Sequence, residues 1–435
     1  MMMHTAIAKS VKSQLVTRAS ACVRKPHSAL PVKNRVNRDH EEVAMPNLGR
    51  RDVLKLGGML AASGLPAAQA ASHRPSRTTL KALEPVQQQT INFIYDGLHL
   101  TPLEYGRILQ QYTESGDFHP DNYSNGGVIR ELEQTFARLL GKESAVFMPT
   151  GTLANHIAMR ELAGAQRRVI VQAESHIYND CGDCTQTLSG LNLIPLGPRQ
   201  AGFTLEDIQD VLSTMRSGRV ETQVGVISIE TPVRRQPDAM FGYDEIRRIA
   251  HAARQAGIRL HLDGARLFVE AVHTGVSPAQ YSALFDTVYV SLYKCFNAAS
   301  GAILAGTQAF TENLYHVRRM FGGGMPQVWP CAAVALHFAD SFLDDYRTAW
   351  QHAKTLFHHL NAHPAFRVEY LPNGTHIVKL HVDTADLDAF RGKLYQRQIH
   401  LPAASPGQHI VALKINLSLN HASAVDMAQA FIAAL

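Results

Sequence analysis

The stretch His261-Leu262-Asp263-Gly264-Ala265-Arg266-Leu267-Phe268, HLDGARLF, decides the fold class. It follows a β-like run at 257–260, so Asp263 falls at the end of a strand that is expected to be buried. A carboxylate in that position is costly unless a positive group meets it. Arg266 and a bound cofactor are both candidates for that positive group.

Around this stretch, short apolar runs alternate with helical periodicity. We expect strands at 145–148, 169–171, 193–196, 224–229, 258–262 and 288–292, and helices at 153–162, 205–215, 243–256 and 278–284. Strands separated by helices predict an α/β fold whose sheet is mostly parallel and covered by helices on both faces.

The same pattern gives the domain boundaries. Residues 118–325 are predicted to form a large cofactor-binding domain, preceded by an arm at 71–117. After the glycine-rich break at 321–326, one long amphipathic helix (about 330–361), alternating segments and a last helix predict a smaller α/β domain over 326–435.

The first 70 residues differ from the rest of the chain. They carry 11 Lys and Arg against 4 Asp and Glu, whereas the remainder carries 31 against 33, so the net charge of +5 comes from this leader. No basic field remains on the body for nucleic acid, and no apolar run is long enough to span a membrane. Residues 49–55 (GRRDVLK), a weakly apolar stretch and the Ala-x-Ala at 68–70 resemble a twin-arginine export signal, which predicts a periplasmic protein, with a cytoplasmic one as the alternative. Translation is expected to begin at Met45.

Three predicted strand ends carry polar residues. The strand at 145–148 leads through a glycine-containing turn into a helix, and the N–H groups at the start of that helix suit a phosphate. The strand at 258–262 is followed by Asp263. The strand at 288–292 leads into Ser-Leu-Tyr-Lys at 291–294. In open α/β sheets, ligands bind at these carboxyl ends of the strands. The candidate residues are Thr150, Gly151, Thr152, Asp263, Arg266, Ser291 and Lys294.

A phosphate cradle, a carboxylate and a lysine in this order are the parts that hold pyridoxal 5′-phosphate (PLP). A lysine amine forms a Schiff base with the aldehyde, and a carboxylate keeps the pyridine nitrogen protonated. The pyridinium would then be the positive group that meets Asp263. The competing interpretations are a salt bridge between Asp263 and Arg266, and a surface position for Lys294.

The sequence from about residue 123 to 327 resembles the threonine aldolase and aromatic amino acid β-eliminating lyase family of fold-type I PLP enzymes. The resemblance is carried by residues 127–133 (GVIRELE), 150–155 (TGTLAN), 175–178 (SHIY), 261–268, Lys294 and 322–325 (GGGM). It implies a PLP-dependent transferase-like fold and a homodimer or homotetramer. It also implies that Lys294 bonds to PLP, that Asp263 binds the ring nitrogen, that Arg266 contacts the ring's oxygen side and that His176 stacks on the ring.

The sequence departs from the family where the substrate should bind. Tyr95 stands where the family's arm has serine, Pro326 follows GGGM where arginine is common, and residues 230–235 read ETPVRR where a histidine is expected. The arginine expected near the C-terminus has Lys414 as its nearest match, and a lysine lacks the bidentate fork of arginine. Tyr95, Arg234, Arg235 and Lys414 are therefore the candidate substrate-binding residues.

These residues predict a PLP-dependent lyase that cleaves a β-hydroxy amino acid or eliminates a β-substituent. The alternatives are a transaminase or racemase on the same fold, or a PLP-binding protein with weakened turnover. No metal is expected, because Cys181-Gly182-Asp183-Cys184 has no second pair at zinc spacing. A structural or incidental pair of thiols is the better interpretation of that motif, with a disulfide as an alternative if the protein is exported.

Overall fold

The computed structural model describes residues 90–114, 118–404 and 409–435. The predicted leader, Met45, the export signal and the first part of the arm lie outside the described residues. Among the described residues, no helix is long and apolar enough to cross a membrane.

A seven-stranded sheet organises the first part of the fold. Its order is β2-β8-β7-β6-β5-β3-β4, and the neighbouring strands from β7 to β4 run parallel, while β8 is antiparallel to both β2 and β7. The structure therefore confirms a mostly parallel sheet. The strands are β2 (Ser144–Met148), β3 (Arg168–Gln172), β4 (Asn192–Leu196), β5 (Val224–Glu230), β6 (Arg259–Asp263), β7 (Thr287–Ser291) and β8 (Ala302–Gly306).

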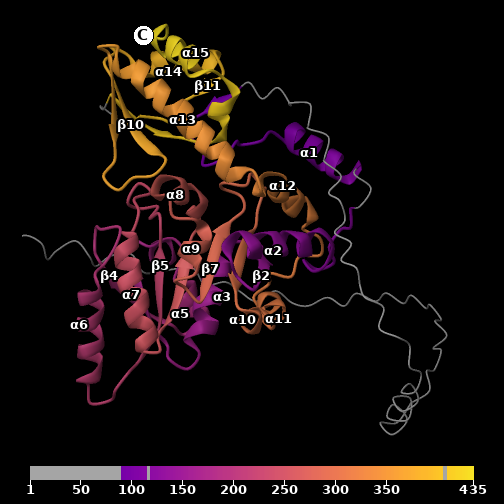
Figure 1. Cartoon of the computed structure of the whole chain (residues 1–435), viewed down its shortest axis with the longest axis vertical. Coiled ribbons are helices and arrows are strands. Elements are labelled where there is room, and N and C mark those ends of the chain that lie inside the picture. Colours follow the sequence, from indigo (N-terminus) through magenta and orange to yellow (C-terminus); the bar gives the residue numbers. More distant parts are fainter. Residues whose placement is uncertain (1–89, 115–117, 405–408) are drawn as a thin grey trace, which may run out of the picture. The chain divides into compact units, whose positions relative to one another are not determined.

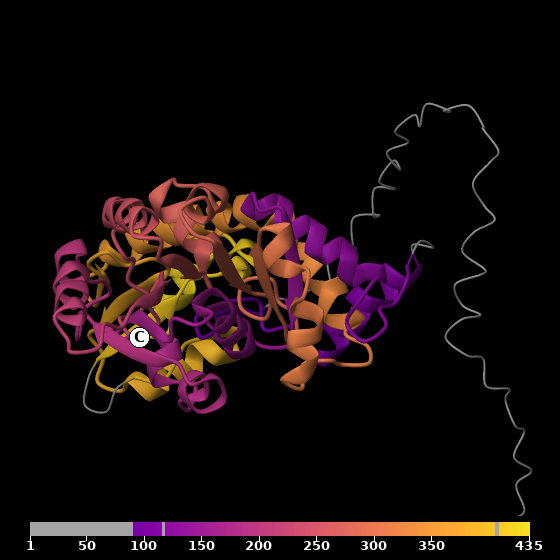
Figure 2. The same cartoon turned by 90° about the horizontal axis from the view of Figure 1, so that it is seen from below.

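Helices cover both faces of this sheet (Figures 1 and 2). Alternate strand residues separate the two layers: Ile170 and Ile227 join the core under one layer, whereas Val169 and Val226 join the core under the other. The first layer holds α2 (Gly127–Leu140), α6 (Leu205–Arg216), α7 (Tyr243–Gln255), α8 (Leu267–Thr274) and α9 (Pro278–Ser282). The second holds α3 (Gly151–Ala163), α4 (His176–Asn179), α5 (Cys184–Ser189), α10 (Gln308–Thr311) and α11 (Leu314–Met320).

A second apolar core forms around a three-stranded antiparallel sheet of order β12-β10-β9. Its elements are β9 (Phe366–Tyr370), β10 (Ile377–Val382), β12 (Ile410–Lys414), α14 (Leu387–Gln396), a 3-10 turn (Leu417–His421) and α15 (Ala424–Ile432). The last part of α13 (Phe342–Asn361) packs into this core, and α13, α14 and α15 lie beside β10 in Figure 1.

The predicted long helix at about 330–361 is two helices. The structure has α12 (Trp329–Ala339) and α13, separated at Asp340 and Ser341. Ala332, Ala335 and Phe342 pack into the core of the seven-stranded sheet, whereas Ala349 and Leu356 pack into the second core. The connection thus crosses from one core to the other inside α13, after residue 346.

The N-terminal arm is part of both cores. Its strand β1 (Ile91–Asn92) pairs in parallel with β11 (Ile399–His400), and α1 (Pro102–Glu114) follows and packs on α12. Phe93 is fully buried in the second core, and Leu98 packs into the first. A short stretch of the arm therefore connects the two cores, and it passes the strand ends where the candidate site lies.

Candidate active site at the strand ends

The N-terminus of α3 follows the end of β2 and packs closely against β7. Thr150 caps the helix, with its hydroxyl oxygen accepting from the Leu153 N–H at 3.2 Å. The N–H groups of a first helical turn have no acceptor within their helix, so they are available to an anion. A Cβ on Gly151 would lie 2.0 Å from the Tyr289 hydroxyl oxygen, so the chain requires glycine here. Thr152 is the next residue along this turn.

Asp263 ends β6, buried and oriented by its neighbours. Asn155, on α3, donates its side-chain N–H to Oδ2 of Asp263 at 2.5 Å, and the Ala265 N–H donates to Oδ1 at 3.2 Å. The Asn155 oxygen lies 2.9 Å from Nε2 of His261, and burial lowers the pKa of His261 to about 3. A neutral His261 can donate from Nε2 to this oxygen, which fixes the amide so that its N–H groups face Asp263.

The structure contradicts the interpretation of Arg266 as the partner of Asp263. The Arg266 guanidinium donates to Asp96 Oδ2 at 2.8 Å and lies 3.4 Å from Asp238 Oδ1. Both carboxylates come from outside HLDGARLF, so sequence proximity to Asp263 was misleading. Among the described residues Asp263 forms no ion pair, and its carboxylate is held by Asn155 and the Ala265 N–H, as expected if its positive partner is a ligand.

Lys294 lies within the charge field of these residues, three positions past the end of β7. Burial, and then the charge of Arg266, lower the pKa of Lys294, while Asp263, Asp96 and Glu230 oppose the shift. Lys294 is partly buried, which favours a site lysine over a surface lysine. Ser291, the last residue of β7, is fully buried.

His176 begins α4, close enough to Asp263 to feel its charge. Its backbone N–H donates to Oε2 of Glu230 at 2.5 Å. A hydrogen bond with the Cys181 side chain raises the pKa of His176, and the charge of Asp263 acts in the same direction. The structure thus brings His176, Asp263 and Lys294 to one place from three separate strand ends.

Glu230 is a buried acid that the prediction did not include among the site residues. It ends β5 next to Asp263 in the sheet register, and its Oε1 accepts from the Arg234 N–H at 3.0 Å. Burial, reinforced by the negative charge of Asp263, raises the pKa of Glu230 to about 8. The signal was present in the sequence, because Glu230 ends a buried strand as Asp263 does.

Of the candidate substrate-binding residues, Arg234 and Arg235 lie beside His176. Both contact Asp180, at 3.2 and 3.3 Å, and Asp180 is also 3.3 Å from Nδ1 of His176. Their side chains remain about half exposed.

Tyr95 and Lys414 lie at the arm. Lys414 donates to Oδ1 of Asp96 at 2.8 Å, and Tyr95 stacks on His99 with ring centroids 3.9 Å apart. The Tyr95 side chain is 42% exposed, so its ring is accessible to a ligand.

Asp96 is the central residue that the sequence did not reveal. Burial opposes its ionisation, yet Arg266, His376 and Lys414 together hold the pKa of Asp96 well below its usual range. Residues 170 to 318 positions apart form this network, so no local motif could indicate it. Oxygen and nitrogen atoms of Asp96, Asp238 and His376 lie within 4.8 Å of one another, but the Arg266 guanidinium already pairs with both acids, which disfavours a cation there.

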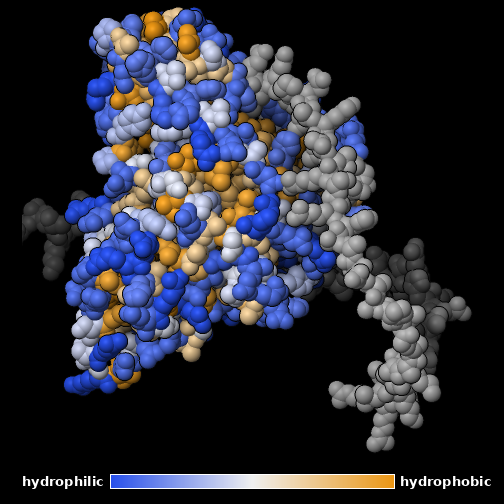
Figure 3. Space-filling model, in the orientation of Figure 1, coloured by the Kyte–Doolittle hydropathy of each residue, from blue (hydrophilic) through white to orange (hydrophobic). Residues whose placement is uncertain are grey.

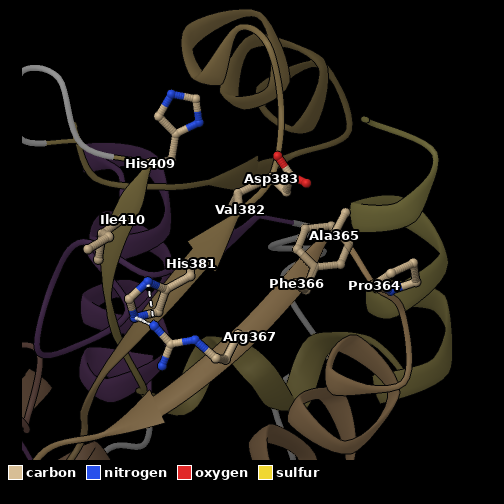
Figure 4. A pocket seen from close by; sticks show the side chains of 9 residues that line it. All are labelled: Pro364, Ala365, Phe366, Arg367, His381, Val382, Asp383, His409 and Ile410. Atoms are coloured by element: carbon tan, nitrogen blue, oxygen red, sulfur yellow. Dashed lines mark hydrogen bonds between the residues drawn. The ribbon is translucent and has the colours of Figure 1, made fainter.

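A surface groove in the small sheet is separate from these residues. It lies along β9, β10 and the start of β12, and Figure 4 shows the Arg367 guanidinium against the His381 ring at its edge. Its lining contains none of the predicted site residues.

Comparison with known proteins places the chain among enzymes of one family. The family described as "Beta-eliminating lyase" matches residues 109–383, more than half of the chain. A low-specificity L-threonine aldolase of Candida albicans is 29% identical over 237 residues, which cover 54% of this chain and 63% of that protein. The chain thus spans less than two thirds of the length of this curated relative.

Solved structures agree in fold. A putative L-allo-threonine aldolase from Listeria monocytogenes has a TM-score of 0.64 and 27% identity, over 80% of this chain and 96% of that one. SPT, solved with its PLP internal aldimine, has a TM-score of 0.59 over 79% of this chain and 87% of that one, and at 18% identity it shows the fold alone. With the family match, these similarities and the strand-end arrangement give one conclusion: the chain belongs to the β-eliminating lyase family.

Proposed function

We propose that this protein is a PLP-dependent lyase that cleaves a bond to the α-carbon of a β-hydroxy amino acid. The observation that carries the proposal is the position of Lys294, which is partly buried just past the end of β7 and close enough to Arg266, Asp263 and Asp96 to feel their charges. Its lowered pKa raises the fraction of neutral, nucleophilic amine.

The residues present fit PLP. The N-terminus of α3, held against β7 by the close approach of Gly151 to Tyr289, suits the phosphate, and Thr152 adds a hydroxyl. Asp263, fixed by Asn155 and with Arg266 paired elsewhere, suits a protonated ring nitrogen. His176 would lie on the ring, and Arg266 would face its oxygen side, as the family resemblance implies. When bound, PLP supplies an electron sink for the bond that breaks.

The chain's own residues would transfer protons and orient the substrate. Lys294 would hold PLP, and its amine is the group of this chain that would move a proton at the reacting carbon. Glu230 retains its proton up to a pKa of about 8, so near neutral pH it adds little negative charge beside Asp263. The Asp180 carboxylate holds Arg234 and Arg235 beside His176, where they are candidates to attract the substrate carboxylate.

Aldol cleavage is the preferred reaction because the named relatives are threonine aldolases, with β-elimination as the second possibility within the same family. A screen of β-hydroxy and aromatic amino acids separates the two, since aldol cleavage releases an aldehyde whereas β-elimination releases ammonia. Keto-acid release with neither product would contradict both and indicate a transaminase.

The role of Lys294 has a direct test. Borohydride reduction of the purified protein should fix PLP covalently to the peptide that contains Lys294, and Lys294→Ala should abolish both the adduct and turnover. Lys379→Ala is the matched control, because that lysine pairs with Glu369 on the small sheet and should leave both unchanged. An adduct on Lys294→Ala at wild-type yield would reject the assignment.

We further propose that the protein is a homo-oligomer. Leu103, Tyr123, Met320 and Met325 expose 40–64% of their area, and Figure 3 shows apolar side chains gathered near the middle of one face. Exposed apolar area of this kind favours association. Light scattering coupled to gel filtration tests the proposal, and a monomer at micromolar concentration would contradict it.

We also propose twin-arginine export to the periplasm, which rests on residues 49–70 of the sequence alone. Replacing Arg50 and Arg51 by lysine should leave the precursor in the cytoplasm of the producing cell. Fractionation with an antibody measures this, and unchanged distribution of the variant would contradict export by this route.

A further inference from the structure

Cys181 and Cys184 lie directly beside the candidate site. Cys181 donates to the Thr152 hydroxyl, with Sγ and Oγ1 3.6 Å apart, and hydrogen-bonds with the His176 side chain. One thiol therefore links the predicted phosphate-binding turn to the predicted ring-stacking histidine. Neither contact needs Cys184, so a second cysteine three residues on requires its own explanation.

The backbone between the two cysteines holds them close together. The Cys184 N–H donates to the Cys181 carbonyl oxygen at 3.3 Å, which closes a β-turn. Both central residues have positive φ, 57° at Gly182 and 52° at Asp183, as a type I′ turn requires. Glycine and aspartate are among the few residues that adopt this conformation readily.

A β-turn of this kind suits a disulfide. It keeps its first and fourth Cα atoms within about 7 Å, and disulfides join Cα atoms that are roughly 4.4–6.8 Å apart. In the structure both residues are thiols, both half-buried, and they hydrogen-bond to each other. Reagents can therefore reach them, and little backbone movement is needed to join them.

The two thiols are chemically unequal. The contact between the two thiols lowers the pKa of Cys184, whereas the same contact, together with burial, raises the pKa of Cys181. Cys184 is therefore the thiol that attacks first. Cys181 has His176 beside it as a base for its proton.

We propose that Cys181 and Cys184 form a reversible disulfide that weakens cofactor binding at the adjacent site. The oxidant is a low-molecular-weight disulfide such as oxidised glutathione. The Cys184 thiolate attacks it, forming a mixed disulfide and releasing one glutathione thiolate. Cys181 loses its proton and attacks the sulfur of Cys184, releasing the second glutathione. The two cysteines are oxidised and one glutathione disulfide is reduced to two thiols, so atoms and electrons balance.

The consequence for the site follows from the lost proton. A disulfide has no S–H to donate to Thr152, and its sulfur is a poorer acceptor for the His176 N–H, so both residues lose the partner that orients them. One hydrogen bond is worth ~1 kcal/mol, so the dissociation constant of PLP should rise about fivefold. The contact that raises the pKa of His176 is lost as well, so His176 should titrate at a lower pH in the oxidised protein. This coupling rests on the proposed function, whereas formation of the disulfide does not.

The test uses the full chain, oxidised with glutathione disulfide and then reduced again with dithiothreitol. Peptide mass mapping should find a Cys181–Cys184 disulfide, and PLP titration should show about fivefold weaker binding that reduction reverses. The pH midpoint of His176 acylation by diethyl pyrocarbonate should fall in parallel.

Two variants separate the proposal from general oxidation. Cys184→Ser retains Cys181 with its contacts but cannot form the bond, so its PLP affinity should not respond to oxidant. Cys331→Ser removes a half-buried thiol that contacts Tyr105, and it should respond as the wild type does. Failure to find the disulfide, or a disulfide that leaves PLP affinity and the His176 midpoint unchanged, overturns the proposal. A chain that binds no PLP contradicts the proposed function instead, and the thiol pair is then decided by mass mapping alone.

Discussion

Several carboxyl groups are buried in this structure, and each is accommodated by a different set of neighbours. Asp96 is paired with Arg266 and Lys414, hydrogen-bonds to the His376 ring, and stays ionised. Asp263 relies on an amide and a backbone N–H, which leaves its charge for a ligand to neutralise. For Glu230 and Glu270 burial outweighs the groups that favour the ionised form, and it raises the pKa of Glu230 to about 8 and of Glu270 to about 7. Burial by itself therefore does not identify the acid that serves the cofactor; the partners do.

Glu270 gives a pH-dependent prediction that does not involve the site. Its carboxyl group accepts from Thr231 and Tyr281, both at 2.8 Å, and its pKa lies near 7 in place of 4.5. A raised carboxyl pKa contributes stability that is complete below pH 4.5 and is lost as pH rises through 7. Glu270→Gln should therefore match the wild type at pH 4.5 and be more stable by roughly 2 kcal/mol at pH 8.

Urea unfolding at pH 4.5, 6 and 8 measures this difference. Asp388→Asn is the control, because that side chain is 87% exposed and should show no such trend. A Glu270→Gln protein that is less stable than the wild type at pH 8 would show that the ionised carboxylate is preferred there.

At the scale of elements, α3 depends on its first residue. The backbone at Gly151 lies against the Tyr289 ring of β7, so a methyl group would force the helix terminus away from the strand. Gly151→Ala should cost ~1–3 kcal/mol of unfolding free energy through overpacking, and it should weaken PLP binding because the helix N–H groups move. Thermal unfolding and PLP titration measure the two effects.

Gly106→Ala is the matched control for that substitution. Gly106 lies inside α1, and nothing is within 4 Å of the added Cβ, so alanine should stabilise the helix slightly. If Gly151→Ala behaves like this control, the close packing of α3 against β7 has no energetic weight.

Most strands of the large sheet could be predicted from the sequence, whereas one strand and one helix boundary could not. Each predicted strand of the seven-stranded sheet has a counterpart in the structure, because buried parallel strands are short, apolar and bounded by turns. Strand β8, also fully buried, was missed since it follows the small residues 298–301 without a helix before it. The single helix predicted at 330–361 failed for the opposite reason, since apolar periodicity continues across the break at Asp340 although the two halves face different cores.

Local sequence motifs identified the site residues that lie at strand ends, but they did not identify contacts between residues far apart in the sequence. Lys294, Asp263 and the α3 turn each follow a strand, so the pattern of strands predicted that they would meet. Asn155 lay within a quoted motif, but its contact with Asp263 spans 108 positions. The partners of Arg266 come from residues 96 and 238, and tertiary structure alone brings such distant positions together.

In the whole molecule, the N-terminal arm joins the two cores at the site. Phe93 lies in the second core with its carbonyl accepting from the Lys414 N–H at 2.9 Å, and three residues later Asp96 meets Arg266. Gly97 then passes so close to the Lys294 carbonyl oxygen that a Cβ would lie 2.4 Å from it. Folding of the arm and of the cofactor site are therefore expected to be coupled.

Asp96→Asn tests this coupling. An amide cannot neutralise Arg266 and Lys414, so the variant should lose about 1–3 kcal/mol of unfolding free energy at pH 7. Because the pKa of Asp96 is held well below 3.8, its contribution is complete above pH 3.8 and is lost as pH falls toward the folded value. The difference in unfolding free energy between variant and wild type should accordingly be constant from pH 5 to 7 and narrow below pH 4.

PLP affinity of Asp96→Asn should fall as well, because Arg266 loses the partner that fixes it. Asp383→Asn, a matched change in the groove of the small sheet, should alter neither quantity. If Asp96→Asn weakened neither stability nor PLP binding, the arm would be a passive cover and the network through Arg266 would carry no coupling between the two cores.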